Sequence, residues 1–483
     1  LFMSLSMLLQ RYLLSFVAVR IDGGALDFLA RKLLDLQISY FEARKIGDIR
    51  RRLEGVRAVR EFVVGNAVAV LTAIARLGAA LVLLGVYSPM LLGLFLLTLP
   101  LVTPRLRGAD EIEYFSYLRS FVFDGDLEFG NEYRHFYEQD PRGLEGFRKT
   151  FLERREPDTG NHINFAPLGT ALLWSPLYLV AHAGVLVARA LGAGVAADGF
   201  SLPYVAAAAY GSALLAWLGL LLVHDALRRH GGVGEPAATW CVAALWLGTP
   251  LLYYTTLAPG FSHAASVFAV SLAVWLALRL DERRATPLRD WATAGAAVGL
   301  AGLVREQDAL YGIVPGGVLV WHTLRTREWA LGLARGAVLG GAAILVFAPQ
   351  LLAYRAINGA YAPSRLVARK MSWSSPHFLE VLFSPGHGLF LWSPLLLVAA
   401  CGLALALARR WPPRMLPLLA AALLLQVWIN GAVESWSQAG AFGSRRFVGA
   451  TVLFAFGLGA VLDELVGHAL AVGVAGGEAI GEV

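Results

Sequence analysis

The sequence is poor in charged residues and in cysteine. Of its 483 residues, 16% are charged and 57% are hydrophobic. A soluble globular domain carries roughly 25% charged residues, and this composition therefore argues against a soluble protein. The two cysteines, Cys241 and Cys401, both fall in apolar stretches. We expect them to be small buried residues, and we expect neither a disulfide nor a metal site there.

Two signals for other kinds of protein are also missing. The sequence contains no Gly-x-x-x-x-Gly-Lys-Ser/Thr loop to hold nucleotide phosphates, and so no ATP-binding motif is available. The net charge of +6 does not predict nucleic-acid binding. Its arginines lie mainly in short loops between apolar runs, a placement that instead indicates membrane topology.

Long apolar runs are what the chain has in abundance. A helix that crosses a bilayer core needs about 20 mostly apolar residues, and runs near that length recur along this chain. They cover 62–86, 201–223, 236–253, 261–279, 290–304, 309–323, 331–353, 389–408, 412–429 and 448–466. We therefore predict an all-α fold, that of a polytopic integral membrane protein with roughly 10–12 transmembrane helices.

Charge sorts the loops between these runs into two groups. Four short loops are rich in Arg, as loops that stay in the cytoplasm usually are. They cover 228–230, 279–284, 325–335 and 409–414. Placing all four inside puts the other polar segments outside: 105–200, 254–260, 305–308, 354–388 and 430–447. We therefore expect a long first extracytoplasmic loop, with the chemistry on that side of the membrane.

Segment 166–190 is apolar, yet we do not expect it to cross the membrane. It follows a polar stretch that contains proline and leads into Ala197-Asp198-Gly199. A crossing helix here would invert every later loop and break the charge rule. We expect a juxtamembrane helix that lies on the outer surface.

An acidic, aromatic-rich segment at 108–135 begins this long loop. Its first acids are Asp110 and Glu111. One carboxylate of such a pair can act as a general base toward an acceptor hydroxyl or amine. The pair can also hold a divalent metal that offsets phosphate charge. The alternative is a solvated acidic loop whose acids cap helices.

Arginines on the outer side are the matching candidates for binding an anion. Arg445 and Arg446 run against the positive-inside trend, and a planar guanidinium suits a phosphate. Arg305 and Asp308 lie in a turn between two short apolar runs, where charges usually face a cavity. We expect Arg305 to bind a phosphate and Asp308 to orient it.

Three histidines complete the set of candidate binding residues. They are His162 and His387, in segments assigned to the outer side, and His263, at the outer end of the run 261–279. His263 begins an apolar run and can bond a phosphate or a sugar hydroxyl. His387 and Trp373 lie in a segment, 371–394, that can cover a sugar. The alternatives are an interfacial histidine satisfied by the backbone and an aromatic belt at the lipid surface.

Residues 105–466 resemble the multi-spanning glycosyltransferases that use polyprenyl-phosphate sugars, the class of protein mannosyltransferases and aminoarabinose transferases. The resemblance rests on the Asp110-Glu111 pair after a transmembrane helix, on the stretch 162–168, and on the helix order. It implies a bacterial inner-membrane enzyme that moves a sugar from a polyprenyl-phosphate donor to a lipid or cell-envelope acceptor. Asp110 would be the base of a single inverting displacement, and the arginines would bind the donor phosphate.

The first hundred residues resemble something different, the transmembrane domain of ATP-binding-cassette exporters. The match is carried by Ser39-Tyr40-Phe41-Glu42-Ala43-Arg44-Lys45-Ile46-Gly47-Asp48-Ile49. We therefore expect four parts: an exporter-like fragment at 1–104, the acidic loop at 105–200, the transferase core at 201–466 and a tail at 467–483. The alternative function is an exporter subunit whose partner carries the ATPase. The two resemblances require opposite directions for 89–104.

Overall fold

The computed structural model describes residues 27–28, 31–32, 34–35, 88–283, 286–365, 371–374, 376–438 and 440–480. The chain divides into two compact units, Leu1–Pro89 and Met90–Val483. The exporter-like segment 39–49 and the apolar run 62–86 lie outside the described residues. Everything that follows concerns the second unit.

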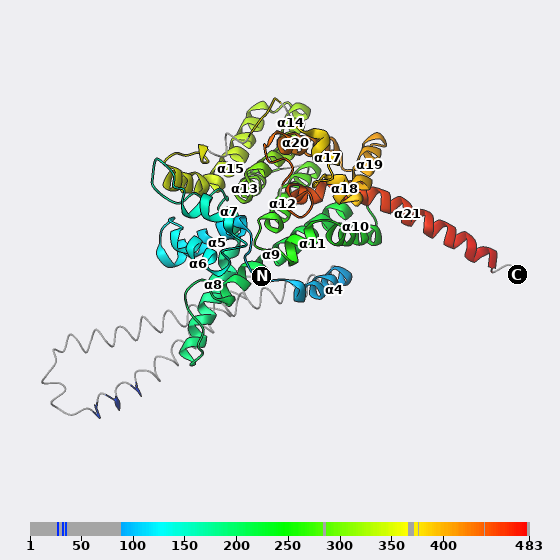
Figure 1. Cartoon of the computed structure of the whole chain (residues 1–483). Helices are drawn as coiled ribbons and strands as arrows, with labels where there is room; N and C mark the ends of the chain where they lie inside the picture. The colour runs from blue at the N-terminus through cyan, green and yellow to red at the C-terminus, as the bar shows by residue number, and fades with distance from the viewer. Residues whose placement is uncertain are drawn as a thin grey trace. The chain divides into compact units, whose positions relative to one another are not determined.

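The second unit is built from helices (Figure 1). Among the described residues, five stretches are long and apolar enough to cross a membrane: α8 (Gly169–Ala190), α9 (Leu202–Arg229), α12 (His263–Glu282), α15 (Trp329–Asn358) and Arg445–Gly467, which runs into α21 (Thr451–Ile480). Other apolar runs form shorter helices: α4 (Pro89–Thr98), α10 (Glu235–Leu247), α13 (Leu288–Val304), α14 (Ile313–Thr326), α19 (Pro394–Ala408) and α20 (Leu416–Ala432). The predicted all-α fold of a polytopic membrane protein is confirmed.

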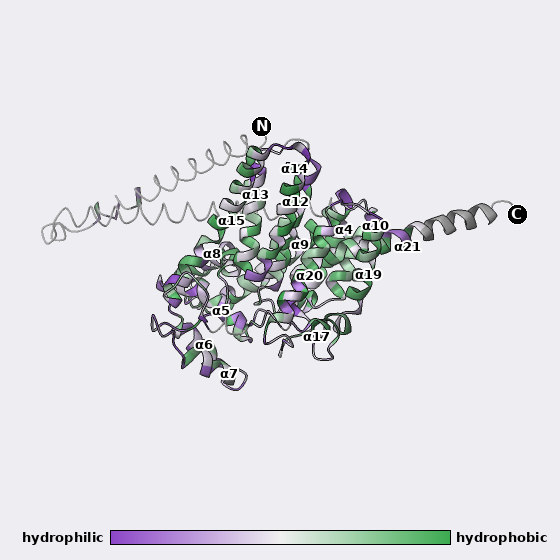
Figure 2. Ribbon diagram, turned by 90° about the horizontal axis from the view of Figure 1, so that it is seen from above, coloured by the Kyte–Doolittle hydropathy of each residue, from purple (hydrophilic) through white to green (hydrophobic). Residues whose placement is uncertain are grey.

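The hydrophobic helices pack closely because small residues line their contacts. Gly219 of α9 lies so near the backbone of α12 that an added Cβ would stand 2.8 Å from the Phe268 nitrogen. Gly295 of α13 lies closer still to α15, where an added Cβ would overlap the carbonyl oxygen of Leu339. Such close approach is how apolar helices gain contact in lipid. Figure 2 shows the resulting hydrophobic body, with hydrophilic residues gathered around α5 and α6.

The four arginine-rich loops meet at one end of the bundle. His230 bonds Glu282 at 2.6 Å, which joins the loop after α9 to the end of α12. Arg414, before α20, forms an ion pair with Asp281 at 2.6 Å. Arg335 donates to the carbonyl of Thr286 at 3.2 Å. We call this end of the molecule the arginine-rich end.

Helix α8 leaves the bundle at the opposite end. Gly169 abuts the last turn of α13. Trp174 then donates to Ser212 of α9 at 2.9 Å, and Tyr178 donates to the carbonyl of Gly199 at 2.9 Å. Helix α8 therefore runs antiparallel to the start of α9 and away from the arginine-rich end (Figure 1). Its length would suffice for a crossing, but its path does not join the two ends. Its place on the outer surface stays a prediction.

Helix α4 runs toward the end that carries Asp110. The Trp217 indole donates to the carbonyl of Leu91 at 3.3 Å, whereas Val102 packs with Ala209 and Ala213. Helix α4 is therefore antiparallel to α9. This is the direction that the transferase resemblance requires of 89–104 if the arginine-rich end faces inward.

The cysteines differ in their surroundings. Cys241 of α10 is fully buried, whereas Cys401 of α19 is exposed, and both are free thiols. The expectation that Cys401 is buried is therefore wrong. An apolar helix in a membrane protein exposes one face to lipid, and an apolar sequence context does not reveal which face is turned inward.

Candidate functional site

The site begins where the acidic loop folds into helices. After Gly108 the chain forms α5 (Ala109–Arg119), and α6 (Gly130–Gln139) and α7 (Glu145–Phe147) follow. The Glu111 carboxylate accepts backbone hydrogen bonds from Arg107 and Gly108, each at 2.8 Å, and from Gly260 at 3.1 Å. It thus caps α5, as a glutamate in the first turn can, and ties that turn to the loop before α12.

Glu111 is therefore fixed in place, and its neighbour Asp110 faces outward. Burial raises the pKa of Glu111, while the three amides that it accepts from oppose the rise. The Glu111 carboxylate bonds three backbone amides, and its geometry is that of a positioning residue. The side chain of Asp110 is 43% exposed and lines a cavity of about 610 Å³.

This cavity brings together five of the nine predicted site residues from distant parts of the chain. We call it the donor cavity, after the donor that the resemblance implies. Its lining includes Asp110, His263, Arg305, Arg445 and Arg446. They come from the start of α5, the start of α12, the end of α13 and the turn before α21. All of these points lie at the end of the bundle opposite the arginine-rich end. The sequence predicts that these residues lie on one side of the membrane, and the structure brings them together in one cavity.

Arg445 holds the carboxylate at the cavity wall. Its guanidinium lies 3.0 Å from the Asp110 carboxylate and 5.2 Å from the centre of the Phe261 ring. Stacking on an aromatic face leaves the edge of the guanidinium free for planar partners. Asp110 and Arg445 thus form one unit, with the acid and the cation side by side.

Arg305 and Arg446 retain unused hydrogen-bond donors. Arg305 donates to His263 Nδ1 at 2.7 Å, and Arg446 donates to Ser435 at 2.9 Å. The Arg305 Nε and one terminal nitrogen of Arg446 are buried and bond to no other described residue. Buried donors are almost always satisfied, and an unsatisfied charged donor is costly. An anion in the cavity would satisfy both.

Asp308 lies behind the cavity wall rather than in it. It is 1% exposed and accepts a hydrogen bond from Ser266 of α12. Its backbone nitrogen donates to the carbonyl of Arg305 at 2.8 Å. The carboxylate thus ties the turn of Arg305 to α12, and the orienting role expected of Asp308 stays a prediction.

His162 and His387 do not reach the donor cavity. His162 lies 2.8 Å from the Arg155 guanidinium and bonds Glu128, and burial lowers its pKa although Glu128 opposes this. His387 bonds the carbonyl of Ser437 at 2.8 Å. Both rings are engaged in holding loops together, which leaves their predicted part in substrate binding without geometric support.

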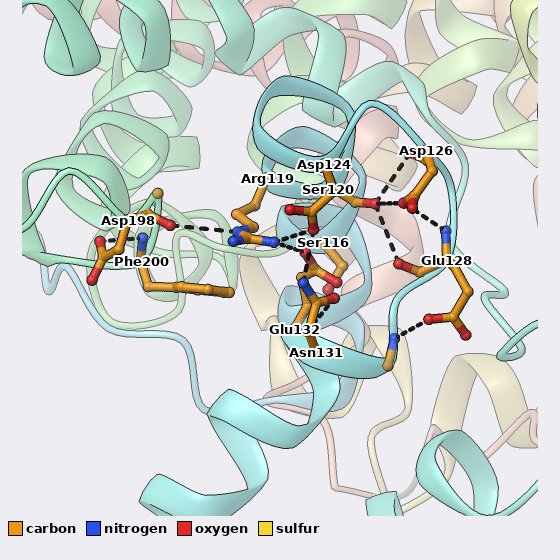
Figure 3. A network of polar contacts seen from close by, with 12 residues as sticks. Ser116, Arg119, Ser120, Asp124, Asp126, Glu128, Asn131, Glu132, Asp198 and Phe200 are labelled. Carbon is orange, nitrogen blue, oxygen red and sulfur yellow. Dashed lines mark hydrogen bonds and ion pairs between the residues drawn. The ribbon is translucent and has the colours of Figure 1, made fainter.

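Several other acids of the loop form a separate network (Figure 3). Arg119 lies at its centre, 2.9 Å from the buried Glu132 and also paired with Asp124. Ser120 donates to Asp126 at 2.8 Å. The guanidinium of Arg119 also stacks on the Phe200 ring at 4.5 Å. These contacts stabilise the loop, and the interpretation of these acids as solvated residues does not hold for Glu132.

A metal site at Asp110 and Glu111 does not fit the geometry. Asp110 pairs with Arg445, and Glu111 is bonded to backbone amides. Across the part of the chain that the structure describes, no group of three or more His, Cys, Asp or Glu side chains is placed to hold an ion. We therefore route no chemistry through a metal.

Sequence reasoning overlooked several residues that line the donor cavity, among them Tyr114, Glu306 and Gln307. Tyr114 donates to Ser262 at 2.8 Å. It follows Asp110 by four residues in a helix, a spacing that places both on one face and that could have revealed it. Glu306 adjoins Arg305 in a turn where charges usually face a cavity, and that position could have indicated it. Trp373, a candidate for covering a sugar, does line it.

The comparisons with known proteins give a family match and a similar solved structure. The family described as the ABC transporter transmembrane region matches residues 1–104, as the exporter resemblance predicted. No curated protein matches the chain. Among solved structures, the chain is similar to the crystal structure of ArnT from Cupriavidus metallidurans bound to undecaprenyl phosphate, at 16% identity and a TM-score of 0.48. The similarity covers 78% of this chain, which spans 60% of that one.

Proposed function

We propose that residues 105–466 form a membrane glycosyltransferase that moves a sugar from a polyprenyl-phosphate donor to an extracytoplasmic acceptor. One observation carries the proposal: a single cavity joins the Asp110 carboxylate to three arginines, two of which keep buried, unused donors. A carboxylate alone would suit many reactions. Beside several guanidinium groups it suits the departure of a phosphate.

The arginines serve the leaving group. As the bond between the anomeric carbon and the phosphate oxygen breaks, its electron pair moves onto the phosphate. Arg305 and Arg446 then face growing negative charge, and fixed donors bind the transition state more strongly than the ground state. Asp308 and His263 hold Arg305 in its orientation.

Asp110 serves the acceptor. Its carboxylate takes the proton from the acceptor hydroxyl or amine while that atom attacks the anomeric carbon. A single displacement of this kind inverts the centre. Glu111 fixes the first turn of α5 and thereby the position of Asp110. The products are the glycosylated acceptor and the free polyprenyl phosphate, with no nucleotide involved.

The arrangement of charge supports an extracytoplasmic site in a bacterial inner membrane. The arginine-rich loops gather at the end opposite the donor cavity, and such loops are retained in the cytoplasm. A donor that carries its sugar on a lipid phosphate can reach the other face, where nucleotide sugars are not supplied. The acceptor would be a lipid or another envelope component on that face.

The decisive experiment uses undecaprenyl phosphate, a product of the proposed reaction, as a probe that does not depend on the sugar. We expect the purified chain to bind it and Arg446→Gln to weaken binding roughly tenfold, since a charge-assisted hydrogen bond is lost. Asp110→Asn should bind normally. Transfer from a panel of undecaprenyl-phosphate sugars should then fail for Asp110→Asn. Absence of binding by the wild-type chain, or full transfer by this variant, would refute the proposal.

A second candidate function rests on the family match at residues 1–104. The chain would then be part of an exporter and would need a partner that carries the ATPase, because it has no phosphate-binding loop of its own. Purification from native membranes tests this. Co-purification of an ATPase and ATP-dependent changes in the chain would favour it over the transferase.

A further inference from the structure

A second cavity lies at the arginine-rich end, far along the bundle from Asp110. Its volume is about 780 Å³, and the ends of α12 and α14 and the segment before α20 form its walls. The charged residues among its lining are Asp281, Glu282, Arg283, Arg325 and Arg414. The proposed transfer reaction uses none of them.

One arginine of this cavity is not engaged in an ion pair. Arg414 pairs with Asp281 at 2.6 Å, and Arg283 pairs with Asp290. Arg325, in the last turn of α14, has no acidic partner among the residues that the structure describes. The two ion pairs thus use two of the three guanidinium groups, and Arg325 is the one left to meet a phosphate.

A buried histidine points to a ligand independently of the arginines. His230 is 6% exposed and lines the cavity. Its Nδ1 bonds Glu282, whereas its Nε2 is buried and bonds to nothing within the described ranges. With the ring neutral and Nδ1 donating to the carboxylate, Nε2 is an acceptor. A hydroxyl next to the phosphate would satisfy it.

The apolar part of the lining indicates a lipid. Trp321 and Leu278 line the cavity beside the charges, and Trp321 is 44% exposed. The Arg414 guanidinium lies 5.6 Å from the centre of its ring. Tryptophan and arginine together are typical of the membrane–water boundary, and basic pockets between helices on the cytoplasmic side bind anionic headgroups.

We propose that this cavity binds the headgroup of an anionic glycerophospholipid. Arg325 binds the phosphate, and His230 accepts a hydrogen bond from a headgroup hydroxyl. The acyl chains lie outside, along the exposed Trp321. The site is a lipid site separate from the donor cavity, and it would stay occupied through the reaction.

The test is lipid binding to the purified, delipidated full chain, followed by native mass spectrometry with phosphatidylglycerol. We expect one lipid per chain to bind more tightly than the rest, and Arg325→Gln to weaken that binding roughly tenfold. Arg289→Gln is the matched control, because Arg289 lies at the same end, is 85% exposed and does not line the cavity. It should bind as the wild type does.

Three results would overturn the proposal. Equal weakening by Arg325→Gln and Arg289→Gln would mean that only surface charge attracts the lipid. Unchanged binding in Arg325→Gln would remove the phosphate contact. Inorganic phosphate that binds as tightly as the lipid, with the same dependence on Arg325, would assign the cavity to a soluble anion. Arg446→Gln should not affect this binding, which separates it from the donor cavity.

Discussion

At the scale of single residues, the donor cavity depends on the shape of the guanidinium group as well as on its charge. Arg305 and Arg446 each use one donor to hold a neighbour and keep another buried and unused. A lysine has the charge but lacks the fork that makes both contacts at once. Charge and geometry can therefore be tested separately.

Arg446→Lys should keep the net charge of the cavity and still weaken the binding of undecaprenyl phosphate. We expect a loss of roughly tenfold, since the fork supplies at least one charge-assisted hydrogen bond that lysine cannot replace. Isothermal titration in detergent measures it. Arg410→Lys, at an exposed position of the arginine-rich end, is the control. Equal affinity in Arg446→Lys would show that only charge matters.

Asp110→Asn should reduce transfer by about 100-fold or more, the usual contribution of a general base. The amide keeps the shape and loses the ability to take a proton, so binding of the lipid phosphate should persist. Initial rates of transfer at saturating donor measure the effect. Asp158→Asn, an exposed acid of the same loop, should retain full activity. Loss of activity in both variants would point to a general effect on the loop.

Glu132 should make stability depend on pH. Burial raises its pKa from 4.5 to about 7, against the opposing effect of Arg119. The folded chain holds the Glu132 proton more tightly than the unfolded chain does. The stability that this proton contributes is therefore complete below pH 4.5 and is lost as the pH rises to about 7. The melting temperature of the wild type should fall over this interval, and the melting temperature of Glu132→Gln should fall less. Parallel curves for the two proteins would contradict this.

At the scale of elements, Glu111 joins the first turn of α5 to the loop before α12. Its carboxylate bonds amides on both segments, and Asp110 and His263 stand on those two segments. Their separation is therefore set by a residue that lines no part of the donor cavity. Loss of these hydrogen bonds should therefore shift both Asp110 and His263.

Glu111→Ala should lower both the melting temperature and the rate of transfer. Each lost hydrogen bond to a charged acceptor contributes about 1.5–3 kcal/mol at most, so that unfolding should occur several degrees earlier. Thermal melting and transfer rates measure the two effects together. Glu138→Gln, on the exposed face of α6, is the control. Lost activity with unchanged stability would instead place Glu111 in the chemistry.

The elements also show where sequence reasoning succeeds and where it stops. Charge sorting brought Asp110, Arg445 and Arg305 together because the ends of alternating helices must lie on alternate sides. The same sorting could not show that His162 lies away from the donor cavity, because it predicts the side of the membrane and not the distances between residues on that side. His162 folds onto Glu128 of its own loop. Such contacts depend on how a long loop packs on itself, which no periodic pattern records.

At the scale of the whole molecule, the two ends of the bundle are predicted to lie on opposite sides of the membrane. The donor cavity lies at one end, and the loops rich in arginine meet at the other. A cysteine at position 110 should react with a membrane-impermeant maleimide on intact cells, and a cysteine at 289 should react only after permeabilisation. Both belong in a Cys241→Ala, Cys401→Ala background, since Cys401 is exposed. The reverse pattern would place the donor cavity in the cytoplasm.

The position of α4 has a practical consequence for dividing the chain. The family match extends to residue 104, yet Leu91, Phe95 and Val102 pack on α9, with the Phe95 ring 4.8 Å from that of Trp217. The last residues of the family match thus pack within the second unit. A shortened gene for the second unit should therefore start at codon 88 or before, because a cut at 105 would strip Trp217 of its cover.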